Sequence, residues 1–230
     1  MKKLVVAIIL SLILVTPLMG TTSIISSNEK ECCIEDYVCE IADSIYKTTG
    51  DCLVAVNYLD SIIEKSYITD TISILNHQIN YFVESGLIKD ALDRFPKLLI
   101  CTQNIRGKSH PTYGDFKQYQ AKLYFSLDSI DLAIEASIEA LDIYNKTKIY
   151  LMGRNDNNPL IFDCYLSLAK YNGLSQNYET ALKYIHKAES IGNLCFDKYD
   201  FEFSRLKYIQ GNIYAENGLH NEALEYFKKS

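Results

Sequence analysis

Residues 208–230, YIQGNIYAENGLHNEALEYFKKS, carry the pattern that decides the fold. Small and aromatic residues stand at helical spacing on either side of a turn residue, Gly218. Such spacing predicts two short helices that meet at that turn. Ala223 in the second helix is expected where the two helices cross, because a larger side chain would push their axes apart. The other members of the motif, also expected to pack the helix pair, are Gly211, Tyr214 and Phe227.

The same surroundings recur upstream, so the pattern is an internal repeat. The equivalent alanines are Ala55, Ala91, Ala133 and Ala181. Nine residues before the alanine, four of the five registers carry an aromatic residue. Five residues before it stand the expected turn residues, Gly50, Gly86, Asp128, Gln176 and Gly218. A single helix pair cannot bury both of its faces, and we therefore expect neighbouring pairs to stack on one another.

This repeat resembles the tetratricopeptide repeat (TPR) family, most closely in its last copy. The resemblance covers residues 36–230 and implies an all-α, helical-repeat solenoid of antiparallel helix pairs, a TPR-like right-handed superhelix. About five repeats are expected, near 36–69, 72–105, 114–147, 162–195 and 204–230. The family's early Trp is missing from every repeat, and so is the usual Pro at the end of the unit.

The extra length of the repeats is expected in helix extensions or loops. Residues 149–160 and 102–114 are rich in turn-forming residues and are expected to be loops. Pro96 falls inside an expected second helix, which should kink or end there, since proline lacks a backbone N–H and clashes with the preceding turn.

The first twenty residues have the layout of a secretory signal peptide. Two lysines precede an apolar run from Leu4 to Val15, and Pro17 follows. Cleavage is expected after Gly20 or Thr22, and an uncleaved N-terminal anchor stays open as the alternative. On this interpretation residues 1–20 direct export to the periplasmic or extracellular side, and residues 21–35 form a linker.

Composition narrows the class of protein further. The net charge of −6 argues against a nucleic-acid partner, which normally calls for a basic face. After residue 20 no apolar span is long enough to cross a membrane. The seven cysteines include no C-x-x-C pair, and most are expected to be small buried hydrophobic residues. A local disulfide involving Cys32 or Cys33 is the best candidate bridge, because export would permit it.

The sequence contains none of the common catalytic or cofactor signatures. It has no Gly-rich phosphate loop, no H-E-x-x-H zinc motif, no EF-hand loop and no G-x-S-x-G nucleophile elbow. We therefore expect a non-enzymatic protein with no cofactor and no metal site.

The resemblance implies that the first helix of each repeat lines a concave face, which in this family usually binds an extended peptide or a partner helix. Eleven residues before each alanine stands a polar row that is basic at its centre, where Lys122 and Lys170 are expected to anchor an acidic group. A second row stands one helical turn earlier on the same face. The remaining partner-binding candidates in the two rows are Asn76, Asn80, Gln118, Tyr208 and Asn212. The alternative is an ordinary solvated helix face.

Three interpretations of the function compete, and the third of them is an enzyme with unrecognised residues. The first is an exported protein–protein interaction scaffold. The second is the extracytoplasmic sensor array of a longer membrane-bound bacterial transcriptional regulator or histidine kinase. The final helix, Leu219 to Ser230, has no polar capping helix after it, so self-association through it is also expected to be possible.

Overall fold

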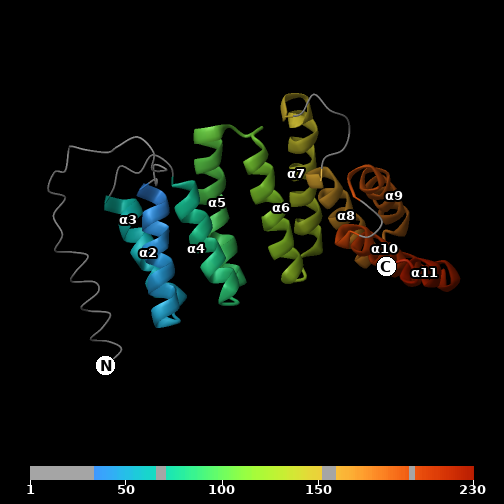
Figure 1. The fold of residues 1–230 in the computed structure, drawn as a ribbon, viewed down its shortest axis with the longest axis horizontal. Helices are drawn as coiled ribbons and strands as arrows, with labels where there is room; N and C mark the ends of the chain where they lie inside the picture. The colour runs from blue at the N-terminus through green and yellow to red at the C-terminus, as the bar shows by residue number, and fades with distance from the viewer. Residues whose placement is uncertain (1–33, 66–70, 152–158, 197–199) are drawn as a thin grey trace. The chain divides into compact units, whose positions relative to one another are not determined.

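A computed structural model describes residues 34–65, 71–151, 159–196 and 200–230, and in these ranges the chain is all-α, with ten helices and no strand (Figure 1). The helices fall into two compact units, one within residues 1–85 and the other within residues 86–230. The first unit contains α2 (Ile34–Thr49), α3 (Cys52–Lys65) and α4 (Ile72–Glu84).

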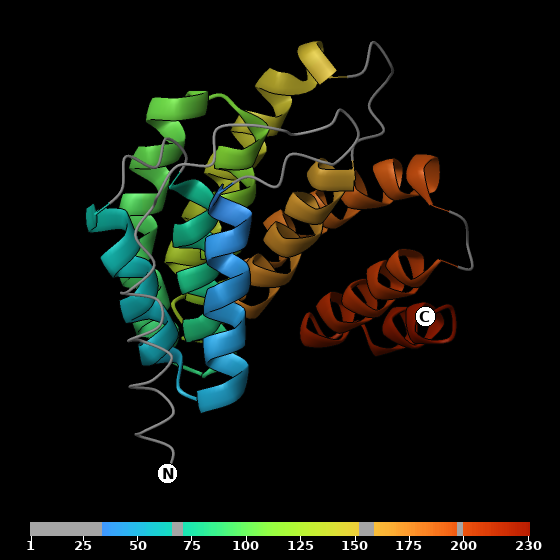
Figure 2. The ribbon, with the colours of Figure 1, turned by 60° about the vertical axis from the view of Figure 1, so that its left-hand side comes forward.

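The second unit contains the other seven helices. They are α5 (Ile88–Arg106), α6 (Pro111–Ser126), α7 (Ile130–Leu151), α8 (Pro159–Leu174), α9 (Tyr178–Cys195), α10 (Phe201–Glu216) and α11 (His220–Phe227). The closest packing is between sequence neighbours that share a tight turn: α6 with α7, α8 with α9 and α10 with α11. Figure 2 shows the last two of these pairs side by side. Further contacts of α8 with α7 and of α10 with both α8 and α9 stack one pair on the next.

The repeated alanines lie where the helices need a small side chain. Ala55, Ala91, Ala133 and Ala181 are fully buried, and Ala223 is nearly so. In the second unit, Ala181 belongs to a core cluster with Phe162, Leu166 and Leu206, and Ala133 packs with Ala121 and Tyr171.

All five expected turn positions adopt a left-handed backbone conformation. The φ angles are +67° at Gly50, +75° at Gly86, +58° at Asp128, +61° at Gln176 and +78° at Gly218. The residue after the turn donates its N–H to the carbonyl five residues earlier, from Ser129 to Tyr124 (2.9 Å), from Asn177 to Asn172 (2.9 Å) and from Leu219 to Tyr214 (2.9 Å). This bond is typical of a Schellman helix end. Two repeats therefore keep the turn without its glycine.

The last helix pair closes around Gly211. A Cβ atom at this position would lie 2.4 Å from Cε1 of Phe227, so only glycine lets α10 approach α11 this closely. On the same pair, the rings of Tyr214 and Tyr226 stack with their centroids 5.0 Å apart. Gly211 and Phe227 thus meet where α10 and α11 pack together, and Tyr214 packs against α11 in the same pair.

Of the two outcomes expected at Pro96, an end of the helix is excluded, because α5 runs from Ile88 to Arg106 with Pro96 inside it. Both expected loops are shorter than predicted. The expected loop at 102–114 is shorter, since α5 continues to Arg106 and α6 begins at Pro111. The expected loop at 149–160 is helical at both ends, in α7 to Leu151 and in α8 from Pro159, and its centre lies outside the described residues.

The proposed signal peptide, most of the linker, and Cys32 and Cys33 lie outside the described residues. Of the other cysteines, Cys39, Cys52 and Cys164 are buried, as expected for small hydrophobic residues, and Cys101 and Cys195 are partly buried. None of the described helices is both long enough and apolar enough to cross a bilayer.

Candidate functional site

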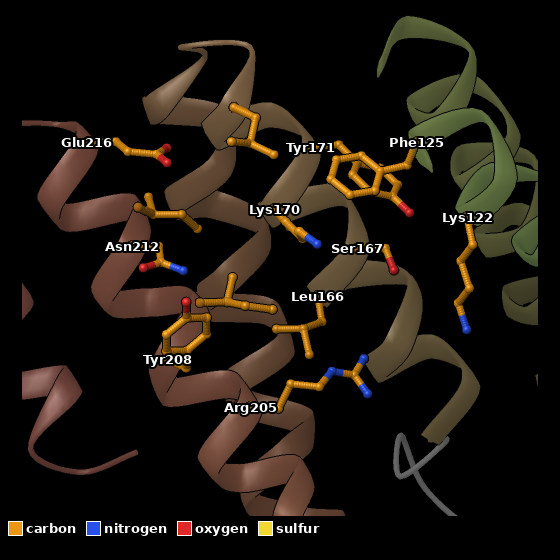
Figure 3. Close-up of a pocket in the computed structure, with 13 residues that line it drawn as sticks. Lys122, Phe125, Leu166, Ser167, Lys170, Tyr171, Arg205, Tyr208, Asn212 and Glu216 are labelled. Carbon is orange, nitrogen blue, oxygen red and sulfur yellow. The ribbon is translucent and has the colours of Figure 1, made fainter. Parts of the chain in front are cut away.

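The first helices of the last three pairs, α6, α8 and α10, border a groove of about 370 Å³ (Figure 3). Its floor is largely apolar, and its polar side chains come from all three helices. The lining residues are Lys122, Phe125, Leu166, Ser167, Lys170, Tyr171, Leu174, Arg205, Tyr208, Ile209, Asn212, Ile213 and Glu216. All of them belong to the second unit.

Three of the lining side chains, from α6 and α8, pack on one another. The ring of Phe125 on α6 stacks on that of Tyr171 on α8, with centroids 4.8 Å apart. The ammonium of Lys170 lies over the same Phe125 ring, 4.2 Å from its centroid. Attraction between the cation and the ring face orients the lysine without neutralising its charge. Tyr171 is buried, and burial raises the pKa of its hydroxyl to about 12, so it stays neutral at physiological pH.

The α10 wall combines a polar and an aromatic side chain. Tyr208 and Asn212 stand one turn apart, and Tyr208 is 55% exposed, which leaves most of its ring accessible. The Tyr208 ring centroid is 6.0 Å from that of Phe227 on α11. The side-chain amide of Asn212 makes no hydrogen bond with any residue that the structure describes. An unoccupied amide next to an exposed aromatic ring suits an extended peptide backbone and one of its side chains.

The positive charges of the groove differ in how they are paired. The guanidinium of Arg205 is 2.6 Å from Asp163 Oδ1 and 2.6 Å from Glu202 Oε2, so its charge is largely compensated. Lys122 and Lys170 form no ion pair with the described part of the chain. The two lysines are exposed on the groove and keep their charge available to a ligand, in a chain whose net charge is −6.

Four of the seven residues expected to bind a partner line this groove: Lys122, Lys170, Tyr208 and Asn212. Gln118 does not. It is buried between α6 and α8, where its amide donates to Ser167 Oγ (2.9 Å) and accepts from Cys164 Sγ (3.5 Å). The structure gives Gln118 a role in joining two repeats, because a buried amide needs internal partners.

The other two expected residues, Asn76 and Asn80, lie on α4 in the first unit and are partly buried. Neither is among the residues that line the groove.

Sequence reasoning missed Phe125, Tyr171 and Glu216. A signal for two of them was present. Phe125 and Glu216 stand eight and seven residues before their alanines, one helical turn beyond the row that contains Lys122 and Asn212. Extending the rows toward the helix ends would have found both. Tyr171 reads as an ordinary core residue, and its burial agrees with that interpretation.

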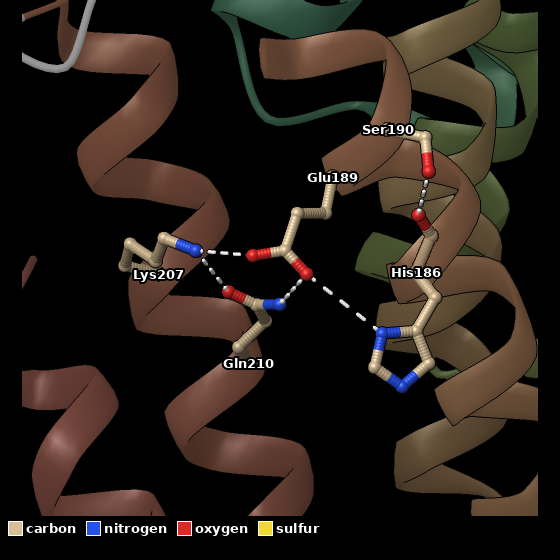
Figure 4. Close-up of polar contacts among 5 residues, drawn as sticks. All are labelled: His186, Glu189, Ser190, Lys207 and Gln210. Carbon is tan, nitrogen blue, oxygen red and sulfur yellow. Dashed lines mark hydrogen bonds and ion pairs between the residues drawn. The ribbon is translucent and has the colours of Figure 1, made fainter.

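A second polar cluster joins α9 to α10 away from the groove (Figure 4). The ammonium of Lys207 lies 2.5 Å from Glu189 Oε1 and 3.0 Å from Gln210 Oε1, and Gln210 Nε2 donates to Glu189 Oε2 at 3.1 Å. The imidazole of His186 stands 3.7 Å from the same carboxylate. Every charge in this cluster meets an internal partner, so it serves the contact between repeats.

The thiol of Cys164 is buried in the contact between α6 and α8. Burial raises the pKa of the Cys164 thiol far above neutrality, so it is not a thiolate at physiological pH. No group of three or more His, Cys, Asp or Glu side chains there is arranged to hold a metal ion.

Comparison with known proteins identifies structures of similar fold, but no match at the level of sequence. No protein-family model matches the chain, and no curated protein matches its sequence. Solved helical-repeat structures do match. A kinesin light chain protein of Podosopora anserina with nearly identical TPR-like repeats has a TM-score of 0.65 at 14% identity, covering 84% of this chain and 91% of its own.

Two further matches come from other kinds of protein. MamA matches with a TM-score of 0.58 at 19% identity, over 85% of this chain and 88% of that one. A Rap protein complexed with Competence and Sporulation Factor matches with a TM-score of 0.61 at 16% identity, and the match spans 87% of this chain but only 54% of the Rap chain. At these identities the matches define the fold alone, an all-α helical repeat of the TPR type.

Proposed function

We propose that this protein is a non-enzymatic interaction module that binds an extended peptide in the groove of α6, α8 and α10. The observation that carries the proposal is the pair Lys122 and Lys170, two lysines without an internal acid that face an apolar hollow in an acidic protein. An acidic group of the ligand would form ion pairs with both ammonium groups. Charge-assisted hydrogen bonds of this kind are stronger than neutral ones.

The other groove residues have complementary roles in this proposal. The amide of Asn212 holds the peptide backbone, because it offers both a donor and an acceptor. Tyr208, which is exposed, and Ile209, which is partly exposed, receive an apolar side chain of the ligand. The stack of Phe125 and Tyr171 keeps Lys170 in place before the ligand arrives, which lowers the entropy lost on binding.

One of the matched structures supports a ligand role for this fold. The Rap protein was solved complexed with Competence and Sporulation Factor, so a helical-repeat array of similar geometry holds a partner there. The same role is proposed for this chain on the strength of its own groove.

The test uses a phage-displayed library of twelve-residue peptides, selected on the full chain. Peptides that are enriched are then synthesised with a fluorescent label, and their affinity is measured by fluorescence anisotropy. We expect peptides that contain an acidic residue, and a loss of affinity of about a hundredfold in the double variant Lys122→Glu, Lys170→Glu, because two attractions become two repulsions.

The matched control is Lys183→Glu. Lys183 is an exposed lysine on α9 whose ion pair with Glu179 lies outside the groove. This control should keep its affinity. Unchanged affinity in the double variant, or the same loss in the control, would overturn the proposal.

We also propose export of the protein, on the basis of residues 1–20 alone. The mass of the protein recovered from the periplasm or medium of a bacterial host tests this. A chain that starts at residue 21 or 23 is expected. A full-length chain that stays in the cytoplasm would contradict export and leave the binding proposal untouched.

A further inference from the structure

We infer that the ligand of this groove is dipolar: a peptide segment that carries a basic group for Glu216 as well as an acidic group for Lys122 and Lys170. The inference rests on the proposed function and makes it more specific, because it adds a second charged contact. It comes from the distribution of charge across the three helices.

Glu216 brings the opposite charge to the α10 wall. It lines the groove and is exposed, and its carboxylate makes no ion pair or hydrogen bond with the residues that the structure describes. A Cβ atom built on Gly173 of α8 would lie 3.7 Å from Glu216 Oε2, so the side chain lies over the glycine of the neighbouring helix. Figure 3 shows the carboxylate directed toward α8, on the opposite side of the groove from Lys122.

The position of Glu216 is unfavourable for the helix that carries it. It is the last residue of α10, where the helix dipole is negative and prefers a cation. Glu202 in the first turn of α10 and Glu179 in the first turn of α9 occupy the favourable end of their helices, whereas Glu84, the last residue of α4, shares the unfavourable position of Glu216. An acid at the wrong end of a helix, lying in a groove and without a partner there, has no stabilising role that the described contacts explain.

Charge complementarity then selects the ligand. A purely acidic peptide that contacts the two lysines would also bring negative charge close to Glu216 and lose part of its attraction. A peptide with an acidic residue toward α6 and α8 and a Lys or Arg toward α10 satisfies all three charges. Leu174 and Ile209, the aliphatic lining residues that are not buried, accommodate the intervening side chain. Opposite charges at the two walls also fix the direction in which the peptide lies.

The experiment uses the labelled peptides that were enriched on the full chain. We expect them to carry both an acidic and a basic residue. Glu216→Lys should weaken binding about tenfold, as an attraction becomes a repulsion, and Glu216→Gln should weaken it about threefold. Changing the basic residue of the peptide to Glu should restore binding to the Glu216→Lys variant. That variant places a cation at a helix C-terminus, so folding should not suffer.

Glu222→Lys is the matched control, because Glu222 is an exposed acid on α11 outside the groove. It should bind the peptides with unchanged affinity. Enriched peptides that depend on Lys122 and Lys170 but bind Glu216→Lys equally well or more tightly would overturn the dipolar ligand and leave the proposed function standing. Peptides that bind without regard to the two lysines, or no enrichment at all, would overturn both.

Discussion

Lys170 on α8 and Lys207 on α10 lie on neighbouring first helices and have similar aromatic neighbours. They differ in burial and in whether an acid pairs with them. The ammonium of Lys170 lies 4.2 Å from the ring centroid of Phe125, and that of Lys207 lies 5.0 Å from the ring centroid of Phe203. The Lys207 side chain is only 8% exposed and meets Glu189, whereas Lys170 is exposed and meets no acid.

The difference shows how this repeat array separates structural from binding charges. A buried ammonium costs too much free energy without a counter-charge, so Lys207 must have Glu189 beside it. An exposed lysine on a groove is solvated and needs no internal partner. Its charge is then available to a ligand, which a paired lysine could not offer. The following predictions test this comparison in order of expected effect.

The largest effect on stability should come from removing Lys207. Lys207→Met leaves the partly buried Glu189 without its cation and fully buried Gln210 without a donor, and should lower the free energy of unfolding by roughly 3 kcal/mol. Lys170→Met should change it by less than about 0.5 kcal/mol, the usual range for a surface site. Urea unfolding followed by circular dichroism measures both. Equal losses in the two variants would remove the distinction between the lysines.

Two adjacent residues of α10, Gly211 and Asn212, should also differ: one substitution should lower stability and the other should weaken binding. Gly211→Ala pushes a methyl group into the Phe227 ring and should cost roughly 2 kcal/mol of stability. Asn212 faces the groove, so Asn212→Ala should lower the free energy of unfolding by less than about 0.5 kcal/mol and should weaken the binding of the selected peptides.

The double variant Gly211→Ala, Phe227→Leu provides the control for the first of these effects, since the smaller side chain should recover part of the lost stability. No recovery would mean that the contact between α10 and α11 is not the cause. Chemical unfolding of the single and double variants distinguishes the two cases.

A smaller effect is expected at the turns between helices. Gln176 holds a left-handed conformation that its Cβ disfavours, so Gln176→Gly should raise the free energy of unfolding by about 1 kcal/mol. Gly218→Ala at the equivalent turn should lower it by about the same amount. Differential scanning calorimetry of the two variants checks the opposite signs. A destabilised Gln176→Gly protein would show that the side chain, and not the backbone, decides this turn.

The smallest effect is the pH dependence of the α9–α10 contact. Partial burial raises the pKa of Glu189, but the hydrogen bonds from Lys207 and Gln210 outweigh burial and hold this pKa below its usual value of 4.5. A lowered pKa in the folded state means that the stabilisation is complete above pH 4.5 and is lost as the pH falls through the folded-state value.

The stability gap between the wild-type protein and Glu189→Gln should therefore be widest at pH 7 and narrow toward pH 3. Urea midpoints measured across this range check it. A gap that stays constant with pH would show that the carboxylate charge is not what holds this contact.

The amino-acid sequence by itself determined the repeat, its alanines and its turns. These features depend on helical periodicity and on backbone preferences within about twenty residues, so local spacing reveals them. The turn positions were even identifiable at Asp128 and Gln176, where the glycine is missing, because the surrounding helices keep their register. The helix that contains Pro96 continues to Arg106, so a proline inside a helical pattern does not by itself set the helix boundary.

Only the tertiary structure decided which polar residues are available for binding. Gln118 and Tyr208 occupy the same position in their repeats, yet Gln118 is covered by Ser167 and Cys164 of α8, while Tyr208 is exposed in the groove. Lys170 and Lys207 differ in the same way, through the presence or absence of an acid from a neighbouring helix. Burial and pairing arise from residues far apart in the chain, and periodicity within one helix carries no information about them.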